Sequence, residues 1–309
     1  MAWAFSLFSR EYPPRQAFAI IVLSSAVWGV LWVPMRHLEA LGLEGLWAVV
    51  LFHILPAFAM APFMRGLWRA APRDRLPAIV AGLLMGAGFV LYSLGLIVAS
   101  VTKTVMLFYM TPIWSTALAY FVLRERAGAA RWLAIVAALA GCGLVTGITE
   151  SALKFDPLDL LGLGSGLFWA MGSVVIRRYD RLDYIHVTFS QYLFGGVLAL
   201  MAAAVVAAPI PALSVWAVAV VPAFVTSSVV FLPTALLIFR IMQYVSPGLV
   251  GVLMLSEAVV AALSAAFYLG EALTPPQWVG VSVILATGVF IGISEGGRRH
   301  AAPPPSHRN

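Results

Sequence analysis

The sequence predicts an all-α membrane protein with ten transmembrane helices, built as two inverted five-helix repeats around a central cavity. Three observations lead to this prediction: composition, the spacing of apolar runs, and a similarity between the two halves of the chain. Of the 309 residues, 62% are hydrophobic and only 10% are charged, and the mean hydropathy is +0.96. Soluble domains are about half apolar and about a quarter charged. A water-soluble fold could not bury so much apolar surface.

The apolar runs give the number of spans. One crossing needs about 20 apolar residues, so the chain has room for roughly ten spans and for no separate soluble domain. The first run is long enough to span and has no small-residue cleavage site after it, so we expect it to be retained. The predicted spans cover residues 16–36, 46–64, 77–98, 104–123, 131–149, 157–177, 184–207, 213–239, 247–269 and 275–294.

The basic residues predict the orientation, because Lys and Arg are enriched in cytoplasmic loops. Only Arg36, Lys103 and Lys154 fall in one set of alternate loops, and all other Lys and Arg residues fall in the second set, which includes both termini. We therefore expect a multi-pass protein of the inner (cytoplasmic) membrane with both termini in the cytoplasm. The polar segment 296–309 should form a disordered cytoplasmic tail. Because the positive charge is explained by topology, we expect no nucleic-acid partner.

The second half of the chain resembles the first. Matching residues occur in the same order at a nearly constant spacing: Ser24 with Ser165, Trp28 with Trp169, Arg36 with Arg177, Thr111 with Glu257, Glu125 with Glu271, and Trp132 with Trp278. Chance similarity between apolar stretches is the alternative, but Trp, Arg and Glu are scarce in such segments. We therefore divide the chain into repeats 1–150 and 151–295. Each has five spans, an odd number, so equivalent helices run in opposite directions, as in secondary transporters with a midplane site.

Glu257 is the most informative single residue. It lies about ten residues from either end of its span, which places it roughly 15 Å deep. A charge at that depth costs at least about 2.5 kcal/mol, so the side chain should face a polar cavity or carry a proton. Two roles remain open. The carboxylate takes a proton or a substrate ammonium, or it only hydrogen-bonds a neighbouring helix beside Ser256.

Pro112 breaks the hydrogen bonding of the fourth span at a similar depth. Proline has no amide hydrogen, so the carbonyl of Phe108 loses its helical partner. The hydroxyl groups of Thr111, Ser115 or Thr116 can supply a replacement donor. Alternatively, the carbonyl faces the cavity and accepts a hydrogen bond from a substrate ammonium.

Aromatic side chains inside the spans are candidates for the wall of the cavity. Trp28, Tyr92, Tyr109 and Trp169 would offer stacking surfaces and cation–π attraction, although ordinary helix packing explains any one of them. No Lys or Arg lies in the middle of a span, which disfavours phosphorylated solutes and favours a neutral or zwitterionic one. One cysteine, Cys142, excludes a disulfide framework. We find no cofactor, metal or catalytic motif and expect no enzymatic activity.

Two glycine pairs occupy equivalent positions in the fifth and tenth spans. They are Gly143 with Gly147, and Gly288 with Gly292. Small residues at this spacing let helix backbones approach closely. We interpret both motifs as sites of helix packing within one chain, and the protein as a monomer or a weak dimer.

Several short motifs resemble one known family. They are Trp28-Gly29, Thr111-Pro112-Ile113-Trp114, the loop residues Glu125 and Gly270-Glu271, and the following Trp132 and Trp278. Together they resemble the drug/metabolite transporter superfamily, in particular the EamA-type exporters and among these the YddG-type exporters of aromatic amino acids. The resemblance implies export of amino acids, aromatic ones among them. We expect the two halves to rock around a central cavity lined by helices one, three, four, six, eight and nine. Many relatives carry a proline where this chain has Ala258, a departure that would let the second repeat lack the helix break of the first.

These arguments predict a secondary transporter that exports small polar metabolites, amino acids above all and aromatic ones among them, by alternating access. Its partners would be that solute, the lipid bilayer and protons. The predicted substrate-binding residues are Trp28, Tyr92, Tyr109, Thr111, Trp169, Ser256 and Glu257, and coupling is assigned to Glu257 as a hypothesis. The alternatives are a drug or purine exporter, a receptor or scaffold, and an intramembrane enzyme, which would need Glu257 and His53 to converge.

Overall fold

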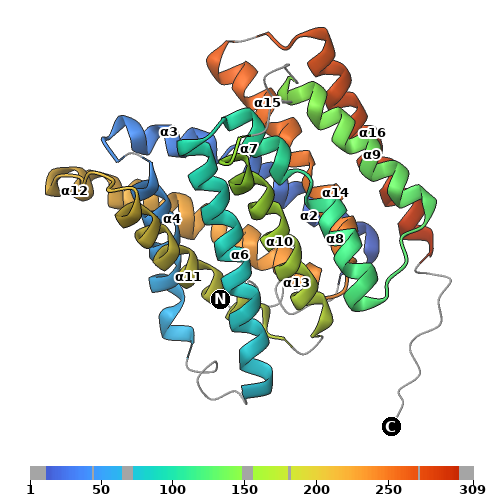
Figure 1. Cartoon of the computed structure of the whole chain (residues 1–309), viewed down its shortest axis with the longest axis horizontal. Coiled ribbons are helices and arrows are strands. Elements are labelled where there is room, and N and C mark those ends of the chain that lie inside the picture. The colour runs from blue at the N-terminus through green and yellow to red at the C-terminus, as the bar shows by residue number, and fades with distance from the viewer. Residues whose placement is uncertain are drawn as a thin grey trace.

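The computed structural model describes residues 12–43, 45–64, 72–147, 156–179, 182–270 and 272–298, and every regular element in that part of the chain is helical (Figure 1). The elements are α2 (Pro14–Gly29), α3 (Trp32–Ala40), α4 (Leu46–Met60), η1 (Ala61–Phe63), α6 (Pro72–Val98), α7 (Val101–Phe108), α8 (Thr111–Leu118), η2 (Ala119–Leu123), α9 (Ala129–Thr146), α10 (Asp159–Arg178), α11 (Tyr184–Val205), α12 (Leu213–Phe224), η4 (Val225–Phe231), α13 (Leu232–Met242), α14 (Pro247–Met254), α15 (Ser256–Leu269) and α16 (Pro275–Arg298).

Ten helical stretches among the described residues are long and apolar enough to cross a membrane. They are Pro14–Ala40, Leu46–Phe63, Arg75–Val98, Val101–Leu123, Ala129–Thr146, Asp159–Arg178, Tyr184–Val205, Leu213–Met242, Pro247–Leu269 and Pro275–Ser294. Each corresponds to one predicted span. The prediction of a ten-span, all-α membrane protein is confirmed.

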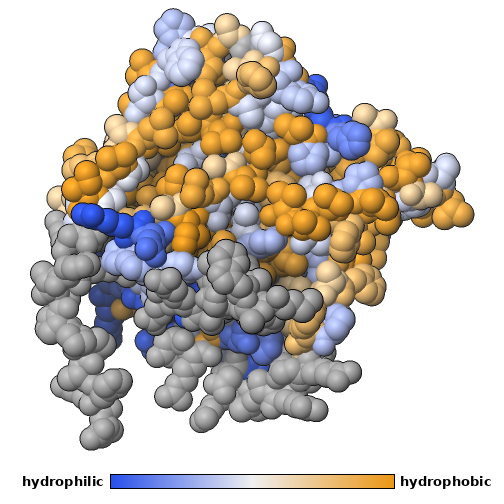
Figure 2. All heavy atoms as spheres, turned by 180° about the vertical axis from the view of Figure 1, so that it is seen from behind, coloured by the Kyte–Doolittle hydropathy of each residue, from blue (hydrophilic) through white to orange (hydrophobic). Residues whose placement is uncertain are grey.

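The surface of the helix bundle is apolar over most of the face drawn in Figure 2, and hydrophilic side chains gather toward one end. Large apolar side chains point outward, such as Phe267, which is 93% exposed, and Phe121, which is 75% exposed. Exposed apolar patches of this extent mark contact with a membrane or a partner. Here they cover the outward sides of helices that are long enough to span.

We name the two ends of the bundle by their loops. The basic face carries the connections near residues 124–128, 182–183 and 243–246, and the opposite face carries those near 41–43, 99–100, 206–212 and 272–274. Of the basic residues predicted on the opposite face, Arg36 and Lys103 lie there, and Lys103 pairs with Asp159 at 3.1 Å. Lys154 lies outside the described residues, as does Glu271.

Two spans break at equivalent places. The fourth span breaks at Tyr109 and Met110, between α7 and α8, and the ninth breaks at Leu255, between α14 and α15. The expectation that Ala258 lets the second repeat lose its break is therefore wrong. The turn forms without proline because the amide of Ala258 donates to the carbonyl of Leu255, three residues back, at 3.1 Å.

The fifth and tenth spans, α9 and α16, pack side by side. Their closest backbone approach is at Gly280, where a Cβ atom would lie 2.5 Å from the carbonyl oxygen of Gly141. The predicted glycine motifs do not make this contact: a Cβ atom on Gly147 or Gly288 would meet nothing within 4 Å. Gly147 instead ends α9 with a φ of +73°. The prediction of helix packing is therefore wrong for Gly147 and Gly288, whereas Gly143 is buried and a Cβ atom on Gly292 would lie 3.7 Å from Phe18 of α2.

The last helix is longer than expected. The sequence places the start of a disordered tail at residue 296, whereas α16 continues to Arg298. Residues 299–309 lie outside the described part of the chain.

Candidate functional site

A cavity of about 740 Å³ extends into the bundle from the opposite face. At its mouth it is lined by residues near the ends of spans, including Arg36, Glu39, Gly45, Ile97 and Val101. Its inner end is lined by residues from the middle of spans, namely Trp28, Phe52, Phe89, Tyr92, Tyr109 and Glu257. The cavity therefore connects one face of the protein with the centre of the bundle.

One wall of the inner end is aromatic. The ring of Trp28 makes edge contacts with Phe52, Phe89 and Phe231, at centroid distances of 6.0, 5.9 and 5.1 Å. Phe52 and Phe89 stack on each other at 5.5 Å with an interplanar angle of 7°. The indole N–H of Trp28 has no hydrogen-bond partner among the described residues. This wall is rigid, apolar and well suited to hold a flat or apolar group.

Glu257 lies on another wall of the same cavity, in the first turn of α15. Its side chain is half-buried and also lines an adjoining void of about 20 Å³. Within the described part of the chain its carboxylate makes no hydrogen bond and no ion pair. The chain thus leaves an acidic group at mid-depth free to bind something that enters the cavity.

Gly29 fixes the distance between these two walls. A Cβ atom on Gly29 would lie 2.6 Å from the carbonyl oxygen of Glu257 and 2.9 Å from the Cβ of Val260. Only a residue without a side chain allows α2 and α15 to approach this closely. Because Gly29 follows Trp28 directly, the same contact sets the aromatic wall against the acidic one.

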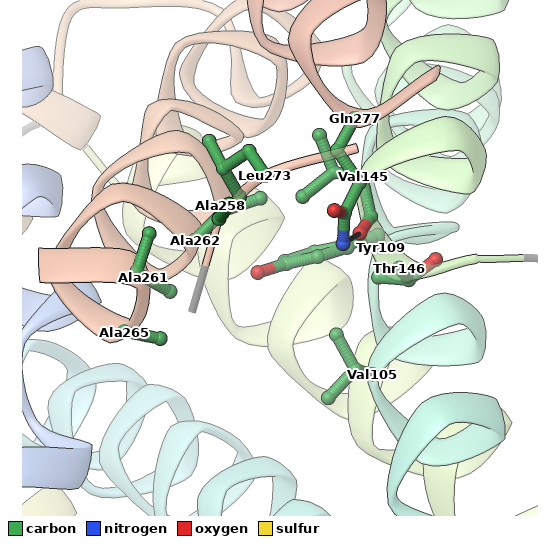
Figure 3. A pocket seen from close by; sticks show the side chains of 12 residues that line it. Val105, Tyr109, Val145, Thr146, Ala258, Ala261, Ala262, Ala265, Leu273 and Gln277 are labelled. Atoms are coloured by element: carbon green, nitrogen blue, oxygen red, sulfur yellow. Dashed lines mark hydrogen bonds between the residues drawn. The ribbon is translucent and has the colours of Figure 1, made fainter. Parts of the chain in front are cut away.

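The hydroxyl-bearing rings of Tyr92 and Tyr109 complete the inner end. Tyr92 packs against Phe108 at a centroid distance of 4.8 Å. Tyr109 ends α7 and also lines a second pocket of about 240 Å³, where it extends toward the alanines of α15, Ala258 and Ala262 among them (Figure 3). Tyr109 therefore stands between two spaces that flank α15.

Three predicted site residues do not line the main cavity. The hydroxyl of Thr111 donates to the carbonyl of Phe108, so the freed carbonyl in the fourth span has an internal partner. The hydroxyl of Ser256 donates in the same way to the carbonyl of Leu253, at 2.9 Å. In both spans a hydroxyl side chain thus supplies the donor missing at the break. Trp169 and Thr111 line only the small void next to Glu257.

The set of lining helices also differs from the expectation. Spans one, three, four and nine line the main cavity as predicted, whereas spans six and eight contribute none of its residues. Span two lines it instead, through Ala48, Val49 and Phe52. Phe52 and Phe89 were missed because a phenylalanine in an apolar helix gives no sequence signal that separates a cavity wall from lipid or core.

The basic face is closed by polar contacts between the two halves of the chain. Arg177 donates to Glu125 of the first half at 3.0 Å and, within its own half, to the backbone carbonyl of Gln243 at 2.9 Å. Arg131 donates to the hydroxyl of Ser246 at 2.9 Å. The bundle is thus open toward one face and tied together at the other.

Of the two groups named for an enzymatic alternative, Glu257 lines the main cavity and His53 does not. His53 is fully buried, and its Nδ1 lies 2.9 Å from the carbonyl oxygen of Val49. It is not among the residues that line the cavity with Glu257. Among the described residues there is no group of three or more His, Cys, Asp and Glu side chains that could hold a metal ion.

Comparison with known proteins identifies the family to which the chain belongs. The model of the EamA-like transporter family matches residues 16–147 and again residues 157–293. One relative, the "Uncharacterized transporter YoaV" of Bacillus subtilis (strain 168), is 26% identical over 196 residues, which cover 59% of this chain and 64% of the relative. A solved structure described as "Crystal structure of protein" has a TM-score of 0.69 at 20% identity, over 90% of this chain and 98% of that one, and so shows likeness of fold. The chain belongs to the EamA-like transporter family of the drug/metabolite transporter superfamily.

Proposed function

We propose that this transporter exports small polar metabolites, amino acids above all and aromatic ones among them, by alternating access. The observation that carries the proposal is the cavity, in which a free carboxylate and an aromatic wall share one space of about 740 Å³. Sites for small molecules typically have volumes of about 300–1,000 Å³ and a few polar groups in an apolar lining. An ammonium group would bind Glu257 while an apolar or aromatic side chain rests against Trp28.

Alternating access requires two halves that can move relative to each other. Three features support it: the matched residues of repeats 1–150 and 151–295, the equivalent breaks in spans four and nine, and the polar contacts that join the halves at the basic face. In the second state of the cycle, the contact between Arg177 and Glu125 would open and the mouth near Arg36 would close. In that state the solute would enter the cavity from the basic face, and return to the state described above would release it at the opposite face.

We further propose that Glu257 couples transport to protons. A single carboxylate cannot hold a proton and pair with an ammonium at the same time, so the two would occupy it in turn. The other ionisable groups that line the cavity are Tyr92 and Tyr109 at the inner end and Arg36 and Glu39 at the mouth. Glu257 is the acidic group among them that lies at mid-depth.

The orientation follows from the basic residues. With the basic face in the cytoplasm, both termini would be cytoplasmic, the protein would lie in the inner membrane, and the cavity would open outward. The protein would act as a monomer or a weak dimer, because one chain contains the whole cavity.

The test is counterflow in proteoliposomes. Purified full-length protein is reconstituted with a high internal concentration of one unlabelled amino acid, and uptake of the labelled form is measured across a panel of amino acids. We expect uptake above that of empty liposomes for at least one aromatic amino acid. The panel also contains purines and cationic drugs. Uptake of these solutes alone would indicate that they, and not amino acids, are the substrates. No uptake of any solute would contradict a carrier function for the cavity.

A further inference from the structure

We infer that the cavity recognises the ammonium group and the aromatic ring of its substrate and makes no specific contact with the carboxylate, so that arylalkylamines bind as well as amino acids do. This inference rests on the proposed function, because it concerns the same cavity. It extends that function from amino acids to amines that carry an aromatic ring and no carboxylate.

The inner end of the cavity offers a cation two kinds of partner. The carboxylate of Glu257 is free of hydrogen bonds and ion pairs in the described part of the chain. An ionised carboxylate in the membrane interior is stabilised by a counter-ion. The rings of Trp28 and Tyr92 line the same space and attract an ammonium through cation–π interaction. Both partners favour a positive group.

The inner end offers an anion no charged partner, since the unpaired indole N–H of Trp28 is a neutral donor. Arg36 is the basic side chain among the residues that line the cavity in the described part of the chain, and it is exposed at the mouth beside Glu39. Its position is seven residues beyond Gly29, which contacts the backbone of Glu257. The chain between them breaks at Val30 and Leu31, between α2 and α3, and at about 1.5 Å per helical residue it carries the backbone of Arg36 roughly 10 Å toward the mouth. In an α-amino acid the nitrogen and the carboxylate carbon are only about 2.5 Å apart. An ammonium bound at Glu257 therefore holds the carboxylate of the same amino acid at the inner end, whereas Arg36 is exposed at the mouth.

The amino end of α15 does not replace a basic side chain. Helix amino ends attract anions through free N–H groups and the helix dipole. In α15 the Ala258 N–H already donates to the carbonyl of Leu255 at 3.1 Å. Glu257 itself sits in the first turn and opposes the approach of a second carboxylate. The hydroxyls of Tyr92 and Tyr109 are neutral and hydrogen-bond to either type of group.

The experiment compares two ligands of the same shape. Phenethylamine and 3-phenylpropionate share a phenyl ring and a two-carbon chain, and differ in carrying an ammonium or a carboxylate. Binding of each, and of L-phenylalanine, is measured by isothermal titration on the purified full-length protein in detergent. We expect phenethylamine to bind within about threefold of L-phenylalanine and 3-phenylpropionate to bind at least about 30-fold more weakly. Equal binding of 3-phenylpropionate, or no binding of phenethylamine, would overturn the inference.

Two variants locate the effect. Glu257→Gln should weaken phenethylamine binding at least about tenfold, since it removes the charge and keeps the shape. Arg36→Gln should leave the ratio of phenethylamine to L-phenylalanine affinity unchanged. If Arg36→Gln weakens L-phenylalanine alone, the carboxylate is recognised at Arg36 and the inference is wrong. The comparison of ligands on the unmodified protein needs no variant and remains decisive if a variant does not fold.

The inference and the proposed function can fail separately. Selective binding of phenethylamine without counterflow of any amino acid would refute amino-acid export and support ammonium recognition. Counterflow of amino acids together with failure of phenethylamine to bind would refute ammonium recognition and support export.

Discussion

Replacing Gly29 by Ala tests the contact that sets the two walls of the cavity. The new methyl group would lie 2.6 Å from the carbonyl oxygen of Glu257 and 2.9 Å from the Cβ of Val260, whereas ordinary contact begins at 3.4 Å. The helices α2 and α15 would have to separate by about 0.8 Å, and one of the clashing atoms belongs to the backbone and cannot rotate away. Overpacking of this kind costs about 1–3 kcal/mol. We therefore expect a lower melting temperature in detergent and, because the two walls of the cavity are displaced, slower counterflow.

The matched control is Gly164→Ala in α10. A Cβ atom there would meet only the flexible end of Leu91, at 3.5 Å, so the same substitution adds no clash. Both variants replace a helical glycine by alanine, at the last residue of α2 and inside α10, and only the change at Gly29 adds a clash. Melting temperature in detergent and counterflow rate in proteoliposomes are measured for both. Parent-like stability and transport of Gly29→Ala, or equal damage by Gly164→Ala, would refute the reasoning.

Three further predictions concern coupling, gating and packing. We expect the transport rate of the parent to depend on pH and that of Glu257→Gln to be independent of pH. A parent transport rate that does not change with pH would refute the coupling role of Glu257. Arg177→Gln removes an ion pair in which Arg177 is 30% exposed and which is worth about 0–1 kcal/mol. Loss of this pair should increase the population that is open at the basic face up to about fivefold. Labelling of a cysteine at Ala261 from the basic face should rise by the same factor, and no rise would argue against a gate there. Gly280→Val should lower the melting temperature because its Cβ would lie 2.5 Å from a carbonyl oxygen of α9, whereas Gly288→Val should not, and equal melting temperatures would contradict this packing.

The spans could be predicted because the apolar surface needed to cross a membrane is a local property of the sequence. Glu257 and Tyr109 could be singled out for a related reason, since polar groups at that depth need a special environment. The structure brings both to one cavity, together with Trp28 and Tyr92. Polarity at depth also selected Thr111 and Ser256, whose hydroxyls instead donate to carbonyls of their own spans.

Features that depend on packing between distant segments could not be predicted. The break in the ninth span has no proline at its centre, and it lies next to a close contact of α14 with α8, where a Cβ atom on Gly251 would lie 3.1 Å from Pro112. The close contact of α9 and α16 at Gly280 has no motif that separates it from the Gly288 pair. The phenyl rings of Phe52 and Phe89 become a cavity wall only through the arrangement of spans two and three.

The central claim is that the transported solute occupies the space between Trp28 and Glu257. The most direct measurement uses the chain with its native cysteine replaced and a single cysteine at Ala261, which lines the cavity about one helical turn from Glu257. A membrane-impermeant maleimide is added to oriented vesicles from either side, with and without a transported amino acid. We predict labelling from the face opposite the basic loops, slowed at least about tenfold by the amino acid. Labelling from the basic face alone, or labelling that no transported solute slows, would contradict the account.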